Sequence, residues 1–587
     1  MRLHPQTFSD APGAKVRPGL LPFPRPLIFL TAFCALAGFI GAGWWAVHVG
    51  KGVGWDQMNY HHYNVWSWLH GRMDAHLAPA GMHSWINPLL YLPSYFMVDY
   101  LPPRLTGFAF GAIAGLNFGL LFLLGCLTLR REVINSAPWL VAAISLAAAI
   151  AGLSDPFFHS NLGTSDADVF LSLTVIGSLC LVCWSSSLAC EDYDQFSTRR
   201  DWAFAAAAAL LGAAAGLKLT YFVYAVAMTI TLLALARPLR MTPRRFTRFA
   251  AGGAAGYALT GGWWNLLMNE RYSNPFMPYW NDIFHSAWLV DSTFRDTRFP
   301  TGSLGAMLGF PLSWLQGEHP TSEGPFRIAI FAVLEILIPI VALLALARLV
   351  RRLRQNAENK KAKQADAPAD HLLTAPTALL LLLVFGVLSY ALWAWMFAIQ
   401  RYLETTALLA GWMLWAACDY LIPWRAAKLA VFGGLCLFSV MWMKGENQGW
   451  RVPYGESWFG VRVPAELQRE DTMLIAVGGG PMAYLTPYLP ASNITVRLNE
   501  LTIPMDGTAT ILVRRAALMI ARHRGPIRSL TSMPLDDNAR YYLARYGLSL
   551  VEAECIQFSS DVTQFTSCPI ARMVAAPDFP NNSPLPR

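Results

Sequence analysis

Long apolar stretches alternate with short polar ones along most of the chain. Runs of about 18 or more apolar residues recur as far as residue 444, and a run of that length can cross the hydrocarbon core of a bilayer as a helix. About eleven spans are predicted on this criterion. They fall at roughly 27–49, 105–129, 137–153, 168–189, 202–217, 219–236, 249–268, 326–350, 373–397, 403–422 and 427–444. The pattern predicts a polytopic α-helical membrane protein.

Basic residues between the spans predict the orientation of the chain. Arginine and lysine gather at Arg130-Arg131, Arg199-Arg200, 236–248, 348–363 and Arg425/Lys428. With an odd number of spans these clusters all face one side, which the positive-inside rule identifies as the cytoplasm. Residues 1–26 are then a cytoplasmic N-terminal segment, and everything after about residue 445 lies outside.

Composition and charge agree with this topology. The chain has 587 residues, 55% hydrophobic and 14% charged, whereas soluble domains carry about 25% charged residues. The net charge of +8 does not indicate nucleic-acid binding, because the basic residues lie largely in short loops between spans. Only Cys555 and Cys568 of the nine cysteines fall in the outer segment, where a disulfide is plausible in an oxidising compartment.

Polar and aromatic residues are concentrated outside the spans. Outer loops are predicted at about 50–104, 154–167 and 269–325. Pumps and carriers usually keep their essential polar residues near the bilayer midplane, so this distribution favours chemistry at the outer interface. The tail, 445–587, alternates strand and helix patterns and is predicted to form a small α/β domain.

The stretch GWDQMNYHHYNVWSWLHGR, residues 54–72, follows the first span directly. Asp56 would be the first residue or the N-cap of a short helix with Tyr60, Tyr63, Trp66 and His70 on one face, lying in the interface plane. A second short helix is predicted to begin at Asn87-Pro88, a favourable N-cap followed by proline at the first helical position.

This arrangement resembles the GT-C superfamily of polytopic membrane glycosyltransferases, including uncharacterised bacterial members. The resemblance rests on the first helix, the outer loop with two short helices, and Asp56 just past that helix. It extends to NLGTSDAD (161–168) and SNPFMPYWNDIF (273–284). Many members carry an acidic pair at the first position, whereas Gln57 follows Asp56 here.

The resemblance implies transfer of a sugar from a polyprenyl-phosphate donor to a lipid, glycan or protein acceptor on the periplasmic side of a bacterial inner membrane. It implies a catalytic module over 27–268, followed by the outer loop 269–325 and further spans over 326–444. Asp56 would be the catalytic base. Asp166 and Asp168 would form a second acidic site for acceptor or metal, or merely cap the next helix.

Other residues are assigned to the substrate on the same reasoning. The lipid phosphate needs positive charge, for which Arg401, Lys218 and Arg72 are the candidates, although such side chains also snorkel to lipid headgroups. Tyr60, His61, Tyr63, Asn87, Asn274 and Tyr279 are the expected groove residues. Histidine spacing matches no metal motif, so no metal ligands are assigned, and a divalent metal cofactor is left open.

Three other functions fit parts of the sequence. A transporter or flippase of lipid-linked glycans would show charges lining the spans and paired broken helices, and few buried charges or internal repeats are visible. A non-catalytic scaffold would tolerate Asp56→Asn. An O-antigen ligase or polymerase would centre on a large loop late in the chain.

Overall fold

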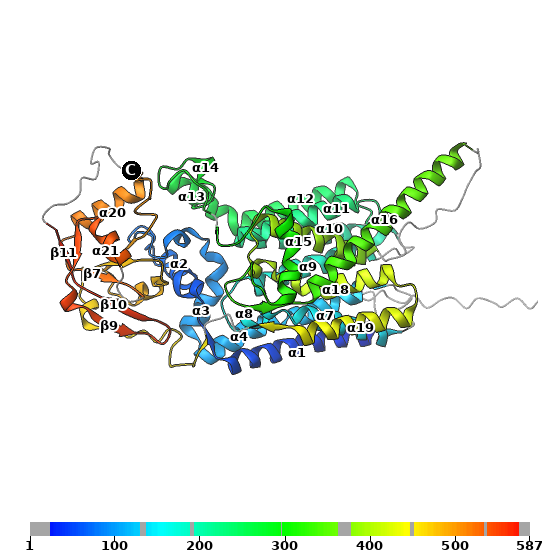
Figure 1. Ribbon diagram of the computed structural model, residues 1–587, viewed down its shortest axis with the longest axis horizontal. Coiled ribbons are helices and arrows are strands. Elements are labelled where there is room, and N and C mark those ends of the chain that lie inside the picture. Colours follow the sequence, from blue (N-terminus) through cyan, green and yellow to red (C-terminus); the bar gives the residue numbers. More distant parts are fainter. Residues whose placement is uncertain are drawn as a thin grey trace, which may run out of the picture.

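The computed structural model describes residues 24–129, 137–187, 193–294, 296–361, 377–445, 451–532 and 537–573. Most long helices run side by side along the longest axis of the molecule, and the tail lies at one end of this bundle (Figure 1). The short helices of the first outer loop, α2 and α3, lie at the same end, between the bundle and the tail (Figure 1).

Helices coincide with every predicted span. They are α1 Arg25–Val49, α4 Pro103–Gly115, α5 Asn117–Thr128, α7 Pro138–Leu153, α9 Asp168–Ser187, α10 Tyr193–Leu217, η4 Leu219–Tyr221, α11 Phe222–Ala234, α12 Pro243–Tyr257, η5 Ala258–Gly262, α13 Trp263–Tyr272, α16 Ile330–Lys361, α17 Thr377–Met396, η6 Gln400–Leu403, α18 Glu404–Leu421 and α19 Arg425–Trp442. Within the described ranges, six helices are both long and apolar enough to cross a membrane, and two more are apolar but shorter. The multi-pass helical architecture is therefore confirmed, whereas the number of crossings stays a prediction.

Glycines bring two pairs of these helices into backbone contact. A Cβ added at Gly115 of α4 would lie 2.0 Å from the carbonyl oxygen of Gly38 on α1. One added at Gly252 of α12 would lie 2.1 Å from the carbonyl oxygen of Ala205 on α10. Small residues permit this approach, which supplies the packing that holds helices together in lipid.

The first outer loop is buried rather than spread on the membrane surface. It contains η1 Gln57–His61, α2 His62–Leu69, η2 Gly81–Trp85, η3 Pro88–Tyr91 and α3 Leu92–Tyr100. Every residue from 57 to 65 is buried, so the predicted helix lying in the interface plane is wrong in its surroundings. Its rings pack within the loop, Tyr60 against His83 and Tyr91, and His62 packs against Phe459 of the tail. The predicted N-cap at Asn87 is confirmed, since its side chain accepts from the Leu89 amide.

The two other outer loops contain short helices. These are α8 Pro156–Asn161 in the second loop, and α14 Asn281–Phe284 and α15 Leu304–Gln316 in the third.

The tail is the small α/β unit that the sequence predicts. Its parallel sheet has the order β6-β5-β7, and α20 and α21 lie beside it (Figure 1). The elements are η7 Ala465–Leu467, β5 Met473–Val477, η8 Ala483–Tyr488, β6 Ile494–Leu498, α20 Ile511–Arg522, β7 Ile527–Leu530, α21 Asp537–Ala544, β8 Leu548–Leu550, η9 Glu552–Glu554, β9 Ile556–Ser559, β10 Gln564–Ser567 and β11 Ile570–Arg572.

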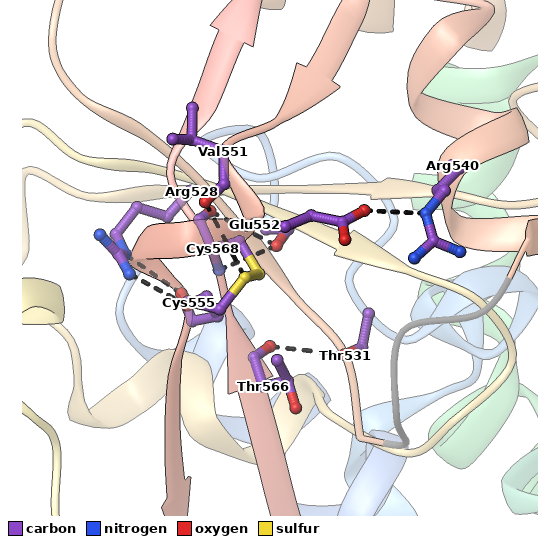
Figure 2. The surroundings of a disulfide bond; sticks show 10 residues. Arg528, Thr531, Arg540, Val551, Glu552, Cys555, Thr566 and Cys568 are labelled. Carbon is purple, nitrogen blue, oxygen red and sulfur yellow. Dashed lines mark hydrogen bonds and ion pairs between the residues drawn. A yellow bond between two sulfur atoms is a disulfide. The ribbon is translucent and has the colours of Figure 1, made fainter.

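A disulfide joins Cys555 and Cys568, the two cysteines for which a disulfide is plausible from the sequence (Figure 2). It ties the start of the β9–β10 hairpin to its end, where Ser529 on β7 donates its backbone amide to the carbonyl of Cys568. The hairpin is therefore fixed to the edge of the sheet.

The tail and the first outer loop form a single structural unit. The backbone amide of Leu77 donates to the Thr495 carbonyl at 2.9 Å, and the Arg497 amide donates to the Leu77 carbonyl at 3.0 Å. Loop residue Leu77 thus extends the sheet beside β6. The antiparallel pair of β1 (Lys51–Gly52) with β4 (Arg451–Val452) adds a further connection, and the pair of β2 (Phe326–Arg327) with β3 (Lys444–Gly445) joins the start of the tail to the segment before α16.

Candidate functional site

Asp56 and Arg401 form an ion pair just beyond the end of the bundle. Asp56 has helical backbone angles, φ −62° and ψ −42°, and makes no capping hydrogen bond. Its carboxylate Oδ2 instead accepts from Nη1 of Arg401 at 2.7 Å. Arg401 lies on η6, the short turn that precedes α18. The alternative that Asp56 serves only as a helix cap is therefore wrong.

A second acid and base pair lies beside the first. Lys218, in the tight turn between α10 and η4, places Nζ 2.7 Å from Oδ2 of Asp168 at the start of α9. Both cations face one aromatic ring: Lys218 Nζ lies 4.6 Å and the Arg401 guanidinium carbon 5.3 Å from the centroid of Tyr402. Four of the six charged candidates thus come together from four separate segments.

The two pairs differ in access to solvent. The side chain of Arg401 is 40% exposed and that of Lys218 is 17% exposed. The Nε of Arg401 has no hydrogen-bond partner among the described residues. Arg401 is therefore the cation better placed to receive an incoming anion.

The carboxyl groups of Asp56 and Asp166 titrate far apart. Burial opposes ionisation of Asp56, but the nearby Arg401 charge, assisted by Lys218, lowers the pKa of Asp56 to about 2. Asp166 forms no ion pair with any residue that the structure describes. Burial, reinforced by the negative charge of Asp56, raises the pKa of Asp166 to about 6. One site thus holds a firmly ionised carboxylate beside a carboxyl group that gains and loses its proton near neutrality.

Histidine and tyrosine side chains form one wall of the site. His61 is buried, which lowers its pKa to about 3 and keeps the ring neutral, and its Nδ1 lies 2.7 Å from Oγ of Ser165. The imidazole stacks on Tyr91 at a centroid distance of 3.8 Å, and Tyr60 stacks on His83 at 5.0 Å. These contacts hold the wall rigid next to Asp56.

Asp56, His61 and Asp166 offer ligand atoms that all lie within 4.8 Å of one another. One imidazole and two carboxylates suit a divalent metal in donor chemistry. However, Arg401 already bonds Oδ2 of Asp56 and Ser165 bonds Nδ1 of His61. A metal held by these three residues would take over positive charge that Arg401 now supplies.

Several predicted residues lie elsewhere or serve the backbone. Arg72 lies past the far end of α2 and donates to the carbonyl of Asn493 in the tail. Asn87 donates to the carbonyls of Gly216 and Thr260, which ties the first loop to α10 and η5. Asn274 is used within its own loop, where it donates to the Tyr279 carbonyl and accepts from the Phe276 amide.

The two remaining groove candidates, Tyr279 and Tyr63, have different surroundings. Burial raises the pKa of Tyr279; Tyr402 and the Asp56 charge raise it further, and the Arg401 charge lowers it. Tyr63 is buried further along α2 and lines a separate recess near the tail.

Sequence reasoning missed four residues at the site. Tyr402 stands next to Arg401 in the sequence, and that adjacency was a usable signal. His83 contributes to the field at Asp56 from the end of the loop that adjoins the tail. Glu404 is buried, and neither carboxylate oxygen has a partner within the described part of the chain. Arg451, from the tail, donates to the carbonyls of Gly50, Ser160 and Leu162.

Comparison with known proteins gives several similar solved chains, two of which are described here. ArnT from Cupriavidus metallidurans bound to undecaprenyl phosphate is 13% identical, with a TM-score of 0.47 over 92% of this chain and 98% of that one. The apo state of the same protein is 12% identical, with a TM-score of 0.44 over the same shares. No protein-family model and no curated protein matches the sequence.

The elements around the site follow a fixed order along the chain. One helix comes first, then an outer loop with short helices, an acid just beyond the first helix and a second acidic segment before a later span. These are the elements on which the resemblance to the GT-C superfamily rests. The multi-pass helical fold with a small α/β tail is confirmed, and membership of that superfamily stays a prediction.

Proposed function

We propose that the protein is a GT-C-type membrane glycosyltransferase. It moves a sugar from a polyprenyl-phosphate donor to an acceptor at the outer face of the membrane. The observation that carries the proposal is the Asp56–Arg401 ion pair at the outer end of the bundle, with Asp166 beside it. An acid and an exposed arginine in contact provide for both halves of glycosyl transfer.

The donor side of the reaction needs stabilisation of a departing phosphate. The bond between the anomeric carbon and the phosphate oxygen breaks, and its electron pair stays on the lipid phosphate. Arg401, with unused guanidinium donors, binds the phosphate oxygens, and Lys218 adds charge behind Tyr402. The site uses no nucleotide sugar, because it faces outward.

The acceptor side needs removal of a proton. As the acceptor oxygen bonds to the anomeric carbon, its hydroxyl proton passes to Asp56. In the free protein Arg401 keeps Asp56 a weak base. When donor phosphate draws the guanidinium to itself, Asp56 loses this neighbouring charge and its basicity rises. Donor binding therefore prepares the base.

Asp166 and Asp168 serve the acceptor in this scheme. Asp166 has no paired cation and can accept a hydrogen bond from an acceptor hydroxyl, whereas Asp168 fixes Lys218. Tyr60, His61 and Tyr279 line the space that holds the reacting sugar. The enzyme works in the inner membrane of a bacterium, with the N-terminus cytoplasmic and the tail periplasmic.

The test is a transfer assay with purified full-length protein and a panel of polyprenyl-phosphate sugars. Mass spectrometry follows release of free polyprenyl phosphate. We expect Asp56→Asn to abolish release, and Asp506→Asn, which removes an exposed acid of the tail, to leave it unchanged. Equal turnover by the wild type and Asp56→Asn would remove Asp56 from the mechanism.

A further inference from the structure

A recess lined by aromatic rings lies where α2, α13 and the tail meet. Tyr63, Trp85, Trp264, Tyr272 and Trp288 line it. Tyr272 and Trp288 meet edge to face with a centroid distance of 5.0 Å. The recess has a volume of about 30 Å³, enough for about two waters or one polar substituent of a ligand.

Two buried polar groups on its wall lack partners. His76 is 4% exposed, and burial lowers its pKa to about 3, so the ring is neutral. Its Nδ1 accepts from the Thr495 amide at 3.0 Å, which places the proton on Nε2. That Nε2, like Oδ1 of Asn64, has no partner among the residues described. The wall therefore offers one hydrogen-bond donor and one acceptor, each costly to leave unpaired.

A wider groove of about 560 Å³ adjoins the recess. Tyr272, Trp288 and Arg515 line both spaces, so a ligand in the groove lies directly beside the recess. The Arg515 guanidinium lies 5.7 Å from the Trp288 ring centroid and donates to the Asp74 carbonyl at 2.8 Å. Glu270 and Arg522 add further charged groups of both signs along the groove.

The recess lies close to the reacting site along the first loop. The helical stretch from Asp56 to Tyr63 covers about 10 Å at a rise of about 1.5 Å per residue. His83, which acts on Asp56, is followed directly by Ser84 and Trp85 of the recess wall.

From this juxtaposition we propose that the groove and recess form a saccharide-binding subsite for the acceptor. A pyranose ring packs its C–H face on Trp288 in the groove and sends one hydroxyl-bearing substituent into the recess. There it accepts from His76 Nε2 and donates to Asn64 Oδ1. A prenyl chain would leave both groups unsatisfied, so the chemistry favours a sugar. That the bound sugar is the acceptor rests on the proposed function. Binding of a sugar in the groove does not.

The experiment measures binding without donor. Full-length protein in detergent is mixed with the methyl glycosides of glucose, galactose, N-acetylglucosamine and glucuronic acid. Saturation-transfer NMR then reports which sugar protons touch the protein. We expect transfer to the ring protons of at least one glycoside, and about tenfold weaker binding in Trp288→Ala, the loss of one aromatic contact.

Arg515→Gln provides a second variant at a half-buried position of the groove, and thermal unfolding checks that both variants fold. Trp424→Ala, which removes an exposed tryptophan at the start of α19, is the matched control and should bind like the wild type. Unchanged binding in both groove variants, or no transfer to any glycoside, overturns the proposal. Either result leaves the transfer assay untouched, and a failed transfer assay leaves this binding result standing.

Discussion

Arg401 donates to Asp56 across 2.7 Å of space and 345 positions of the chain. The arginine belongs to the turn before α18 and the acid to the loop after α1, so the pair forms only when the bundle is complete. In the proposed mechanism the pair links donor binding to proton removal, because it joins a weakly basic carboxylate to a partly exposed cation. Loss of the Asp56–Arg401 pair should change both the stability of the protein and its turnover, and the two effects can be measured separately.

Arg401→Gln should lower both transfer and stability. It leaves the Asp56 carboxylate without its cation, at a cost of about 1–3 kcal/mol, less than for a fully enclosed pair because Arg401 is 40% exposed. Turnover should fall about 100-fold, as for loss of one group that stabilises developing charge. Thermal unfolding and the transfer assay measure the two effects.

The double variant Asp56→Asn, Arg401→Gln supplies the control for this pair. With no charge left unpaired, it should be more stable than Arg401→Gln alone although it remains inactive. A double variant no more stable than the single one would contradict the role given to the pair.

Asp166 should make stability depend on pH near neutrality. Its pKa, raised to about 6, exceeds the usual value of about 3.9 in an unfolded chain. The folded protein therefore binds this proton more tightly, so the stabilisation is full below about pH 4 and is lost as pH rises through 6. Asp166→Asn should shrink the fall in Tm between pH 5 and pH 8 by about 2 °C. An identical fall in both proteins would show that Asp166 is ionised throughout.

Arg451 should act on turnover through position alone. It donates to the carbonyls of Gly50, Ser160 and Leu162, and so holds the second loop against the end of α1. Arg451→Lys keeps the charge but not the fork of donors, and a shift of about 1 Å in the acidic loop can cost 100-fold in rate. We expect kcat to fall with KM for the donor little changed. A change confined to KM would place Arg451 in donor binding instead.

Reduction of the Cys555–Cys568 disulfide should loosen the tail. The two cysteines are 13 positions apart, for which loop closure contributes about 3 kcal/mol. Reductant should lower the unfolding temperature of the wild type and leave that of Cys555→Ser, Cys568→Ser unaffected. The prediction is wrong if the reduced and the oxidised wild-type protein unfold at the same temperature.

The tail and the cytoplasmic end of α16 should label from opposite sides of the membrane. Met505 is 102% exposed in the tail, and Arg354 is exposed near the end of α16. In a background in which serine replaces the cysteines outside the Cys555–Cys568 disulfide, Met505→Cys should react with an impermeant maleimide in intact spheroplasts, whereas Arg354→Cys should react only after permeabilisation. Labelling of both cysteines from the same side would contradict the predicted topology.

Local signals predicted the elements but not their assembly. Apolar runs identified helices such as α1 and α17, and Asn87-Pro88 marked a helix start, because both depend on neighbouring residues alone. The pairing of Lys218 with Asp168 depends on how α9 and α10 pack. The sequence indicated Lys218 and Asp168 as candidates, but the residues next to each in the sequence do not predict that the two form a pair.

Burial was the least predictable property. The aromatic helix after Asp56 has the composition of an interfacial helix, and it is buried because the distant tail covers it. Arg72 has the charge expected of a phosphate ligand, but that tail offers it the Asn493 carbonyl. Contacts between residues hundreds of positions apart leave no periodic trace.

The strand pairing between Leu77 and β6 constrains how the molecule is made. During synthesis the first loop is made long before the segment around Thr495 leaves the ribosome, so the sheet edge stays open in the meantime. Nascent chains that stop before β6 cannot close it. Synthesis of β6 is thus a step that must precede closure of the region around Asp56.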